Sequence, residues 1–256
     1  MQTFIRELWI YPVKSLGGVR VERATITSAG SLALDREWIV VDADDRKVWQ
    51  GDIPRMTLVR VALDEADLKL SMPGMEQLTV ARDHDGEPRT LTMYKRTFRG
   101  IDAGDRAAEW LSRTFGRSLR LVRIGDAAHR WDGLNPVHVV SDASITALNE
   151  ALIEHGHEHV TAMRFRPNVI LGSSQAFAEE ENAVLDFGDA RLTLREPCVR
   201  CELPNISLVD ASRGKQPLKL LGKWSEGRPT AKAASFGTYC SAEGAELRSG
   251  MVAEVA

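Results

Sequence analysis

Short segments in which apolar and polar residues alternate recur from residue 4 to residue 96, and they constrain the fold more than any other feature. β-Branched and aromatic residues are common in these segments, and turn-forming residues separate them. A period of two places every second side chain on the same face of an extended strand, so each segment is predicted to contain half-buried strands. The segments are residues 4–15, 18–28, 37–49, 57–72, 76–82 and 89–96. Short strands at this spacing are typical of an all-β meander or barrel.

Two later segments have a helical pattern instead. Residues 105–116 carry apolar residues at helical spacing and end at Gly116, which suits a C-cap. Residues 141–156 are the clearest predicted helix, and Ser141 can cap its N-terminus. The sequence therefore predicts two or three helices inserted into a mainly β protein.

The change of pattern near residues 100–117 gives the best candidate for a domain boundary. Strand-like runs return after the second predicted helix, at residues 168–172, 190–197 and 245–255. The chain is therefore expected to divide into residues 1–115 and residues 116–256. In the first part, Trp9, Trp38 and Trp49 are expected to pack inside a barrel.

Composition excludes several classes of partner. The net charge of −3 gives no electrostatic reason to expect nucleic acid or an anionic membrane surface. No apolar run approaches the roughly 18 residues that a membrane helix needs, and the N-terminus lacks the pattern of a signal peptide. Three cysteines are too few for a disulfide framework. We therefore expect a cytoplasmic protein with no nucleic-acid or membrane partner.

Two of these cysteines form a C-x-x-C pair in EPCVRCELPN, at Cys198 and Cys201. A structural zinc site normally needs a second pair of ligands, which the sequence lacks. A thioredoxin-type redox pair begins a helix, whereas this pair follows a strand-like run. Burial without chemistry is the third alternative. Arg195 and Arg200 argue against simple burial, because positive charge stabilises the thiolate that ligates metals.

Groups that can bind an anion occur elsewhere in the chain. They are Lys14 with Ser15, Arg36 in LDREW, and Arg164 and Arg166 in RFRPN. Taken singly, each is more typical of a solvated surface charge. A soft thiolate ligand combined with anion-binding groups nevertheless suggests a metal carried on a phosphorylated organic cofactor.

Six segments, taken in order, resemble one family. They are IYPVKSLGG, LALDREWIVVD, SDASITALN, RFRPNVIL, PCVRCELPN and FGTYC. Their order and spacing are similar to those of MOSC-domain proteins that carry the MOSC N-terminal β-barrel, a family that includes amidoxime reducers. The resemblance covers essentially the whole chain. It implies an N-terminal β-barrel-like domain over residues 1–115 and a MOSC β-barrel domain over residues 116–256.

The resemblance also implies a molybdenum cofactor, in which a molybdopterin dithiolene holds Mo and one protein cysteine completes the ligand set. In the family this ligand is the cysteine of the Arg-Cys step, which is Cys201 here, so Cys198 is not expected to bind the metal. Arg200 is expected to contact the pterin, and Tyr239 in FGTY matches a tyrosine near the cofactor. The residues that match those holding the pterin or its phosphate are Lys14, Ser15, Arg36, Arg166 and Asn168.

The sequence departs from the family pattern beside the expected metal ligand. Leu203-Pro204-Asn205-Ile206 replaces a Thr-Thr-x-Asp segment, so the substrate range is expected to differ. Where amidoxime reducers have Asp-Thr-Ser-Pro, this chain has Gly133-Leu134-Asn135-Pro136, which leaves Asn135 as the polar contact. No cysteines remain to ligate an iron–sulfur cluster. Electrons are therefore expected from a separate donor protein that carries flavin, iron–sulfur or haem.

By resemblance, the chain is expected to be a molybdenum-dependent enzyme that reduces N-hydroxylated compounds such as hydroxylamines, amidoximes and N-hydroxylated bases. Cys201, Tyr239 and Asn205 are then the predicted catalytic residues. An alternative is a cofactor or sulfur carrier, because the same domain forms part of molybdenum cofactor sulfurases. Those proteins also bind pyridoxal phosphate through another domain, for which 256 residues are expected to leave no room. A third possibility is a β-rich binding domain without cofactor.

Two polar residues outside these motifs have predicted structural roles. His138 lies in the apolar run PVHVVS and is expected to be a core histidine. Asp132 lies in RWDG and is expected to cap a turn.

Overall fold

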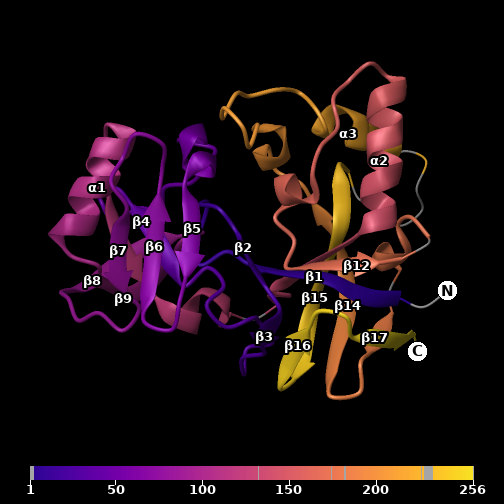
Figure 1. Cartoon of the computed structure of the whole chain (residues 1–256), viewed down its shortest axis with the longest axis horizontal. Coiled ribbons are helices and arrows are strands. Elements are labelled where there is room, and N and C mark those ends of the chain that lie inside the picture. Colours follow the sequence, from indigo (N-terminus) through magenta and orange to yellow (C-terminus); the bar gives the residue numbers. More distant parts are fainter. Residues whose placement is uncertain are drawn as a thin grey trace.

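The computed structural model describes residues 3–131, 133–173, 175–181, 183–225, 227 and 233–255. Over these residues the chain forms two β modules that lie side by side, with the N- and C-terminal ends both at the second module (Figure 1). The described elements are mostly strands, together with three α-helices. The predicted fold class, mainly β with a few helices and two barrel-like parts, is therefore confirmed.

The second module is a barrel that seven strands close within the described part of the chain. Among the described strands of this barrel, β11 and β12 are the one neighbouring pair that runs parallel. Ile5, Val139 and Leu192 belong to the core inside it, and full burial of such a side chain contributes about 1.5–3 kcal/mol. In order around the barrel, the strands are β1 (Thr3–Ile10), β12 (Val169–Gly172), β11 (Val137–Ser141), β15 (Ser235–Gly244), β14 (Ala190–Val199), β13 (Val184–Asp186) and β17 (Val252–Val255), which pairs with β1 again.

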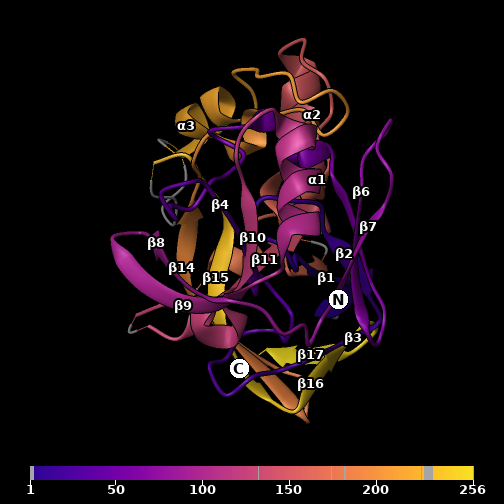
Figure 2. The same cartoon turned by 90° about the vertical axis from the view of Figure 1, so that its left-hand side faces the viewer.

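The first module is a half-barrel with its own core around Trp38, Met56 and Leu68. Helix α1 (Asp105–Phe115) packs onto this core through Trp110 and faces the viewer in Figure 2. The module contains one four-stranded and one three-stranded sheet. In sheet order the strands are β4 (Trp38–Val41), β10 (Arg120–Arg123), β9 (Arg96–Asp102) and β8 (Pro88–Met93), and then β5 (Arg60–Leu63), β6 (Asp67–Ser71) and β7 (Leu78–Ala81).

Strand pairing crosses the predicted division between residues 115 and 116 in both directions. β1 begins the chain but lies in the barrel of the second module, where β2 (Val19–Val21) extends its other edge. β10 follows the division but pairs with β4 and β9 in the first module. A separate ribbon joins β3 (Arg23–Thr25) to β16 (Glu246–Arg248). The division into residues 1–115 and 116–256 stays a prediction, and these pairings tie the two modules together.

Both predicted helices are present. α1 ends at Gly116, whose φ of 67° is left-handed and whose N–H donates to the carbonyl of Ser112. α2 (Asp142–Glu154) begins after Ser141, whose Oγ accepts a hydrogen bond from the Ser144 N–H. A third helix, α3 (Leu218–Ser225), was not indicated by any pattern in the sequence, because its eight residues are too few to show a clear period.

The segment at residues 37–49, which was predicted to contain half-buried strands, forms a named strand only in its first part. Its first half is β4, but Arg46 and Lys47 make isolated bridges and belong to no named strand. The reason is that the segment divides its hydrogen bonds between two neighbours. The Lys47 N–H donates to Thr92 on β8, whereas the Val48 N–H donates to Val40 on β4.

Two irregularities near the end of β14 position the cysteine pair. The register of β14 against β15 shifts between Leu194 and Glu196 and again between Pro197 and Val199. Such bulges bend a strand and re-aim its side chains. β14 ends at Val199, and the chain then passes through Arg200 and Cys201 to the side of the barrel that meets the first module.

Candidate functional site

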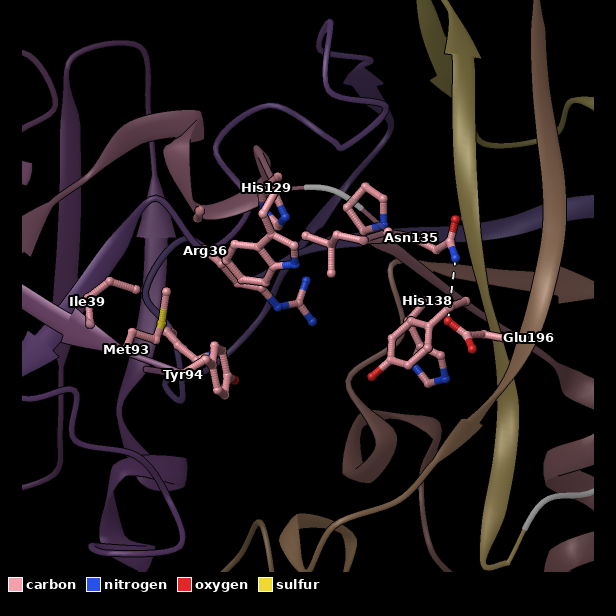
Figure 3. Close-up of a pocket in the computed structure, with 15 residues that line it drawn as sticks. Arg36, Ile39, Met93, Tyr94, His129, Asn135, His138 and Glu196 are labelled. Carbon is pink, nitrogen blue, oxygen red and sulfur yellow. Dashed lines mark hydrogen bonds between the residues drawn. The ribbon is translucent and has the colours of Figure 1, made fainter. Parts of the chain in front are cut away.

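Two adjoining cavities, with volumes of about 390 and 280 Å³, lie where the two modules meet, and we call them together the cleft. Five residues line both cavities: Lys14, Arg36, Tyr94, His138 and Tyr239. Figure 3 shows the larger cavity, with Tyr94 and Met93 from the first module facing Asn135, His138 and Glu196 from the barrel side. Segments far apart in sequence therefore contribute to one site.

Three residues of the predicted anion-binding set share an unusual backbone. Ser15, Arg36 and Arg166 have φ values of 71°, 56° and 55°, in the left-handed region that non-glycine residues rarely adopt. Such a conformation costs of order 1–3 kcal/mol and persists only where the surroundings hold it. The Arg36 N–H donates to the carbonyl of Tyr11 at 2.8 Å, and the Arg166 N–H to that of Met163 at 3.2 Å. Backbone strain of this kind clusters at functional sites, which favours the predicted binding role.

The ring of Tyr11 lies between the two arginines. Its centroid is 4.1 Å from Cζ of Arg166 and 5.0 Å from Cζ of Arg36. Burial raises the pKa of Tyr11, so its phenol stays neutral. Gly18 leaves space for the ring, because a Cβ there would come within 2.6 Å of Tyr11 Cε1. A neutral aromatic side chain thus brings two cations from different modules together.

Arg36 and Arg166 differ in the charge and hydrogen-bond partners that the protein provides for them. Burial alone would lower the pKa of Arg36, but the charge and hydrogen bond of Asp35 raise it above its ordinary value. Burial lowers the pKa of Arg166 to about 10, so it remains charged at neutral pH. Arg166 Nη1 donates to the carbonyl of Leu16 at 2.5 Å, whereas its buried Nη2 has no partner among the described residues. An unpaired buried donor is costly, so Nη2 suits an anionic ligand oxygen.

The cysteine pair is asymmetric. Cys201 is exposed and lines the smaller cavity, whereas Cys198 is only 1% exposed. Arg200 lies between them and donates from Nη1 to Cys198 Sγ at 2.7 Å and from Nη2 to the carbonyl of Phe165 at 2.8 Å. Its buried Nε has no partner in the described part of the chain. The geometry leaves one thiol accessible in the cleft and orients Arg200 through the other.

Tyr239 stands at the rim shared by both cavities and is 36% exposed. Burial raises the pKa of its phenol, and the charge of Cys198 raises it further, so the hydroxyl stays protonated at neutral pH. The Tyr239 ring packs 5.6 Å from that of His138 on the neighbouring strand. His138 is 2% exposed, and burial lowers its pKa well below the usual range. The expectation of a core histidine at position 138 is confirmed.

The three predicted asparagines lie in different surroundings. Asn135 lines the larger cavity, and its Nδ2 lies 3.5 Å from Glu196 Oε1. Asn168 is 0% exposed, and its side chain bonds to Trp9, His138 and Arg36. Asn205 Oδ1 accepts a hydrogen bond from the Leu218 N–H at the start of α3. Protein groups thus bind both polar side-chain atoms of Asn168 and the side-chain oxygen of Asn205, whereas Asn135 lines the cleft.

Sequence reasoning assigned no binding role to three residues of the smaller cavity: Lys47, Trp49 and Tyr94. Trp49 was expected inside a barrel, but it is only partly buried and lines the cavity wall, unlike Trp38, which is 0% exposed. The chain at Trp49 leaves the sheet and turns, with its indole N–H donating to Asp52 at 3.0 Å. Asp132 lies outside the described residues.

Two lysines add positive charge to the cleft. Burial lowers the pKa of Lys14 from 10.5 to about 7, and the charges of Arg36 and Arg166 lower it as well. Burial also lowers the pKa of Lys47. Neither amine forms an ion pair with a carboxylate among the described residues, and both contact the Tyr94 ring. Desolvated, unpaired lysines in a cavity are typical of a site for an anionic ligand.

No group of three His, Cys, Asp or Glu side chains among the described residues could hold a metal ion. A metal in this cleft would therefore need most of its ligands from an organic cofactor, with Cys201 as the protein thiol. No described helix is long and apolar enough to cross a membrane. The cleft offers cationic hydrogen-bond donors for a phosphate and the Cys201 thiol for a soft metal. The residues present therefore fit a metal carried on a phosphorylated cofactor.

The protein is therefore a two-module β protein, in which a barrel is joined to a half-barrel. The cleft between the modules is basic and contains an accessible thiol. Two family profiles cover almost the whole chain: the MOSC N-terminal beta barrel domain matches residues 2–118, and the MOSC domain matches residues 126–254. The chain belongs to the MOSC family, as its sequence motifs predicted.

Curated relatives fall into two groups. The chain is 27% identical to rat mitochondrial amidoxime reducing component 2, over 93% of this chain and 79% of that protein. It is 29% identical to human mitochondrial amidoxime-reducing component 1, over 92% and 77%. It is also 27% identical to human molybdenum cofactor sulfurase, over 92% of this chain but only 29% of that protein. These relatives associate the family with molybdenum cofactor chemistry.

Proposed function

We propose that this protein is a molybdenum cofactor-dependent reductase of N-hydroxylated compounds. The observation that carries the proposal is that one cavity holds both the exposed Cys201 thiol and Nη2 of Arg166, which has no partner among the described residues. The amidoxime-reducing relatives support the reaction class, because the chain matches more than three quarters of their length.

The cleft residues would hold the cofactor as follows. Cys201 would ligate molybdenum, and Arg166 Nη2 and Arg200 Nε would donate to pterin or phosphate oxygens. Lys14, Ser15 and Arg36 would bind the phosphate, and Asn135 would contact the pterin edge. Asn168 would act by positioning Arg36 and not by direct contact, because its side chain is already bonded to protein groups. Bound there, the cofactor would supply the two-electron removal of oxygen from an N–OH group.

The protein's own part in the reaction is to bind, orient and protonate. Tyr239 keeps its phenolic proton at neutral pH, so its Oη can donate a hydrogen bond to the departing oxygen of an N–OH group at the cleft rim. Asn205 Oδ1 accepts a hydrogen bond from the Leu218 N–H, so the predicted catalytic role of Asn205 would fall to its Nδ2 or would require that bond to break. Electrons would come from a separate protein carrying flavin, iron–sulfur or haem, and the cytoplasmic location stays a prediction.

The test compares the two cysteines. Protein expressed with molybdenum cofactor available should contain Mo by mass spectrometry and should reduce a model amidoxime with an artificial electron donor. Cys201→Ser should lose more activity than the roughly 10–100-fold that changing a partner behind a metal ligand costs, because it removes the ligand itself. Cys198→Ser is the comparison and should lose less activity, because its thiol is buried and acts on the cleft only through its hydrogen bond with Arg200. Full activity in Cys201→Ser would refute the assignment.

A carrier of cofactor or sulfur is the second candidate. The sulfurase relatives are similar to this chain at the same level of identity, and Cys201 is exposed enough to carry a persulfide. This role predicts cyanolysable sulfur on the purified protein, lost in Cys201→Ser, together with no turnover of N-hydroxylated substrates. Turnover without cyanolysable sulfur would exclude it.

A further inference from the structure

One wall of the smaller cavity consists of residues that the predicted cofactor set leaves unused. Lys47, Trp49 and Tyr94 line this wall, and Cys201 lines the same cavity. We call these three residues the lysine–aromatic wall. The charge that a cofactor phosphate needs is already supplied by Lys14, Arg36 and Arg166. The wall is therefore free to meet another molecule that enters beside Cys201.

Tyr94 lines both cavities from a tight hairpin turn. It occupies the two-residue turn between β8 and β9, where Tyr94 and Lys95 both have positive φ, 53° and 60°. This is the backbone of a type I′ hairpin, which non-glycine residues adopt only at some cost. The ring remains 56% exposed, and Trp131 packs against it at 6.1 Å between centroids. A fixed, exposed aromatic ring beside a cavity is suited to stack on a planar ligand.

Lys47 gives the wall its charge preference. Its Nζ lies 4.9 Å from the Trp49 ring centroid and 5.0 Å from that of Tyr94, and no carboxylate among the described residues forms an ion pair with it. Lys14 Nζ lies 5.0 Å from the same Tyr94 ring. Two amines over one ring repel a cationic ligand and attract an anionic one. The arrangement therefore favours a planar ligand that carries negative charge.

We propose that the lysine–aromatic wall is a substrate subsite that selects N-hydroxylated compounds with an aromatic ring and an anionic group. This inference rests on the proposed reductase function and narrows its substrate class. Tyr94 stacks on the ring, and Lys47 pairs with the anion as a specificity-determining residue. The N–OH group is then directed towards Cys201, across the same cavity.

The test compares benzamidoxime, which is neutral, with 4-carboxybenzamidoxime, which adds a carboxylate to the same ring. The holoprotein without reductant binds but does not turn over, so dissociation constants can be read from tryptophan fluorescence. Wild type should bind the carboxylate compound roughly tenfold more tightly, the effect of one charge-assisted hydrogen bond. Lys47→Gln should reduce this preference to about twofold or less. Tyr94→Leu should weaken both compounds by a similar factor.

Lys95→Gln is the matched control, because it removes the same charge from the neighbouring turn residue, which is exposed and lines neither cavity. It should keep the wild-type preference. Equal binding of the two compounds by wild type, or an unchanged preference in Lys47→Gln, overturns the subsite. If the preference is present but neither compound is reduced when an electron donor is added, the subsite stands and the reductase function fails.

Discussion

Asn168 gives a prediction that separates a structural role from a cofactor contact. Its side chain is 0% exposed and joins three parts of the chain. Nδ2 donates to the carbonyl of Trp9 on β1 at 3.1 Å, and Oδ1 accepts from the His138 N–H on β11 at 3.2 Å. Oδ1 also accepts a hydrogen bond from Nη1 of Arg36, a residue that lines the cleft, at 3.3 Å. Asn168 therefore links two strands of the barrel to the side chain of Arg36.

The perturbation is Asn168→Ala. The backbone hydrogen bonds of residue 168 would remain. Its N–H donates to the carbonyl of His138, and its carbonyl accepts from the Trp9 N–H. The carbonyl of Trp9 and the N–H of His138 would lose their side-chain partner in a buried site. Each such loss costs about 1–3 kcal/mol, so we expect the free energy of unfolding to fall by about 3–4 kcal/mol. That is a large share of the roughly 5–15 kcal/mol that holds a domain together.

The assay is urea unfolding of cofactor-free protein, followed by tryptophan fluorescence. Asn205→Ala is the comparison, because Asn205 loses a single bond to the first N–H of α3 and should cost only about 1 kcal/mol. If Asn168 served chiefly as a cofactor contact, Asn168→Ala would leave the cofactor-free protein within about 0.5 kcal/mol of wild type. That result would refute the structural reasoning.

Three further outcomes follow from the cleft. Gly18→Ala should lower the free energy of unfolding by about 1–3 kcal/mol, because its Cβ would press on the Tyr11 ring. It should also weaken phosphate binding measured by calorimetry, and unchanged binding would contradict the role of Tyr11 in bringing the two arginines together. Lys14 has a pKa lowered from 10.5 to about 7, so its charged form opposes folding fully below pH 7, and this penalty is relieved as the pH rises from about 7 towards 10.5. In cofactor-free protein, Lys14→Met should therefore be more stable than wild type at pH 7 in urea titrations, with a gap that narrows by pH 9; a gap independent of pH would count against this. Tyr239→Phe should lower the kcat of N–OH reduction by roughly tenfold or more with Mo content unchanged, and an unaltered kcat would remove Tyr239 as a proton donor.

The strand-rich fold, the two capped helices and the family could all be predicted from the amino-acid sequence. Period-two alternation reports which face of a strand is buried, and caps such as Ser141 and Gly116 act on their own helix ends. These signals are local, so they can be read without knowing what packs where. The six motifs also gave the family and the set of basic residues. The structure brings Lys14, Arg36 and Arg166 from that set together around one cleft.

Which polar atoms remain free to bind a ligand could be learned only from the folded structure. The family resemblance pointed to Cys201 and not to Cys198, and the structure supplies the physical difference, because Cys198 is buried whereas Cys201 is exposed after the bulges in β14. Asn168 and Asn205 looked like candidates for ligand contact, yet their partners come from segments distant in sequence. The lysine–aromatic wall had no motif at all, because a hairpin turn and an irregular bridge bring its members together only in the folded chain. Burial and hydrogen-bond satisfaction depend on these long-range neighbours, and no local period records them.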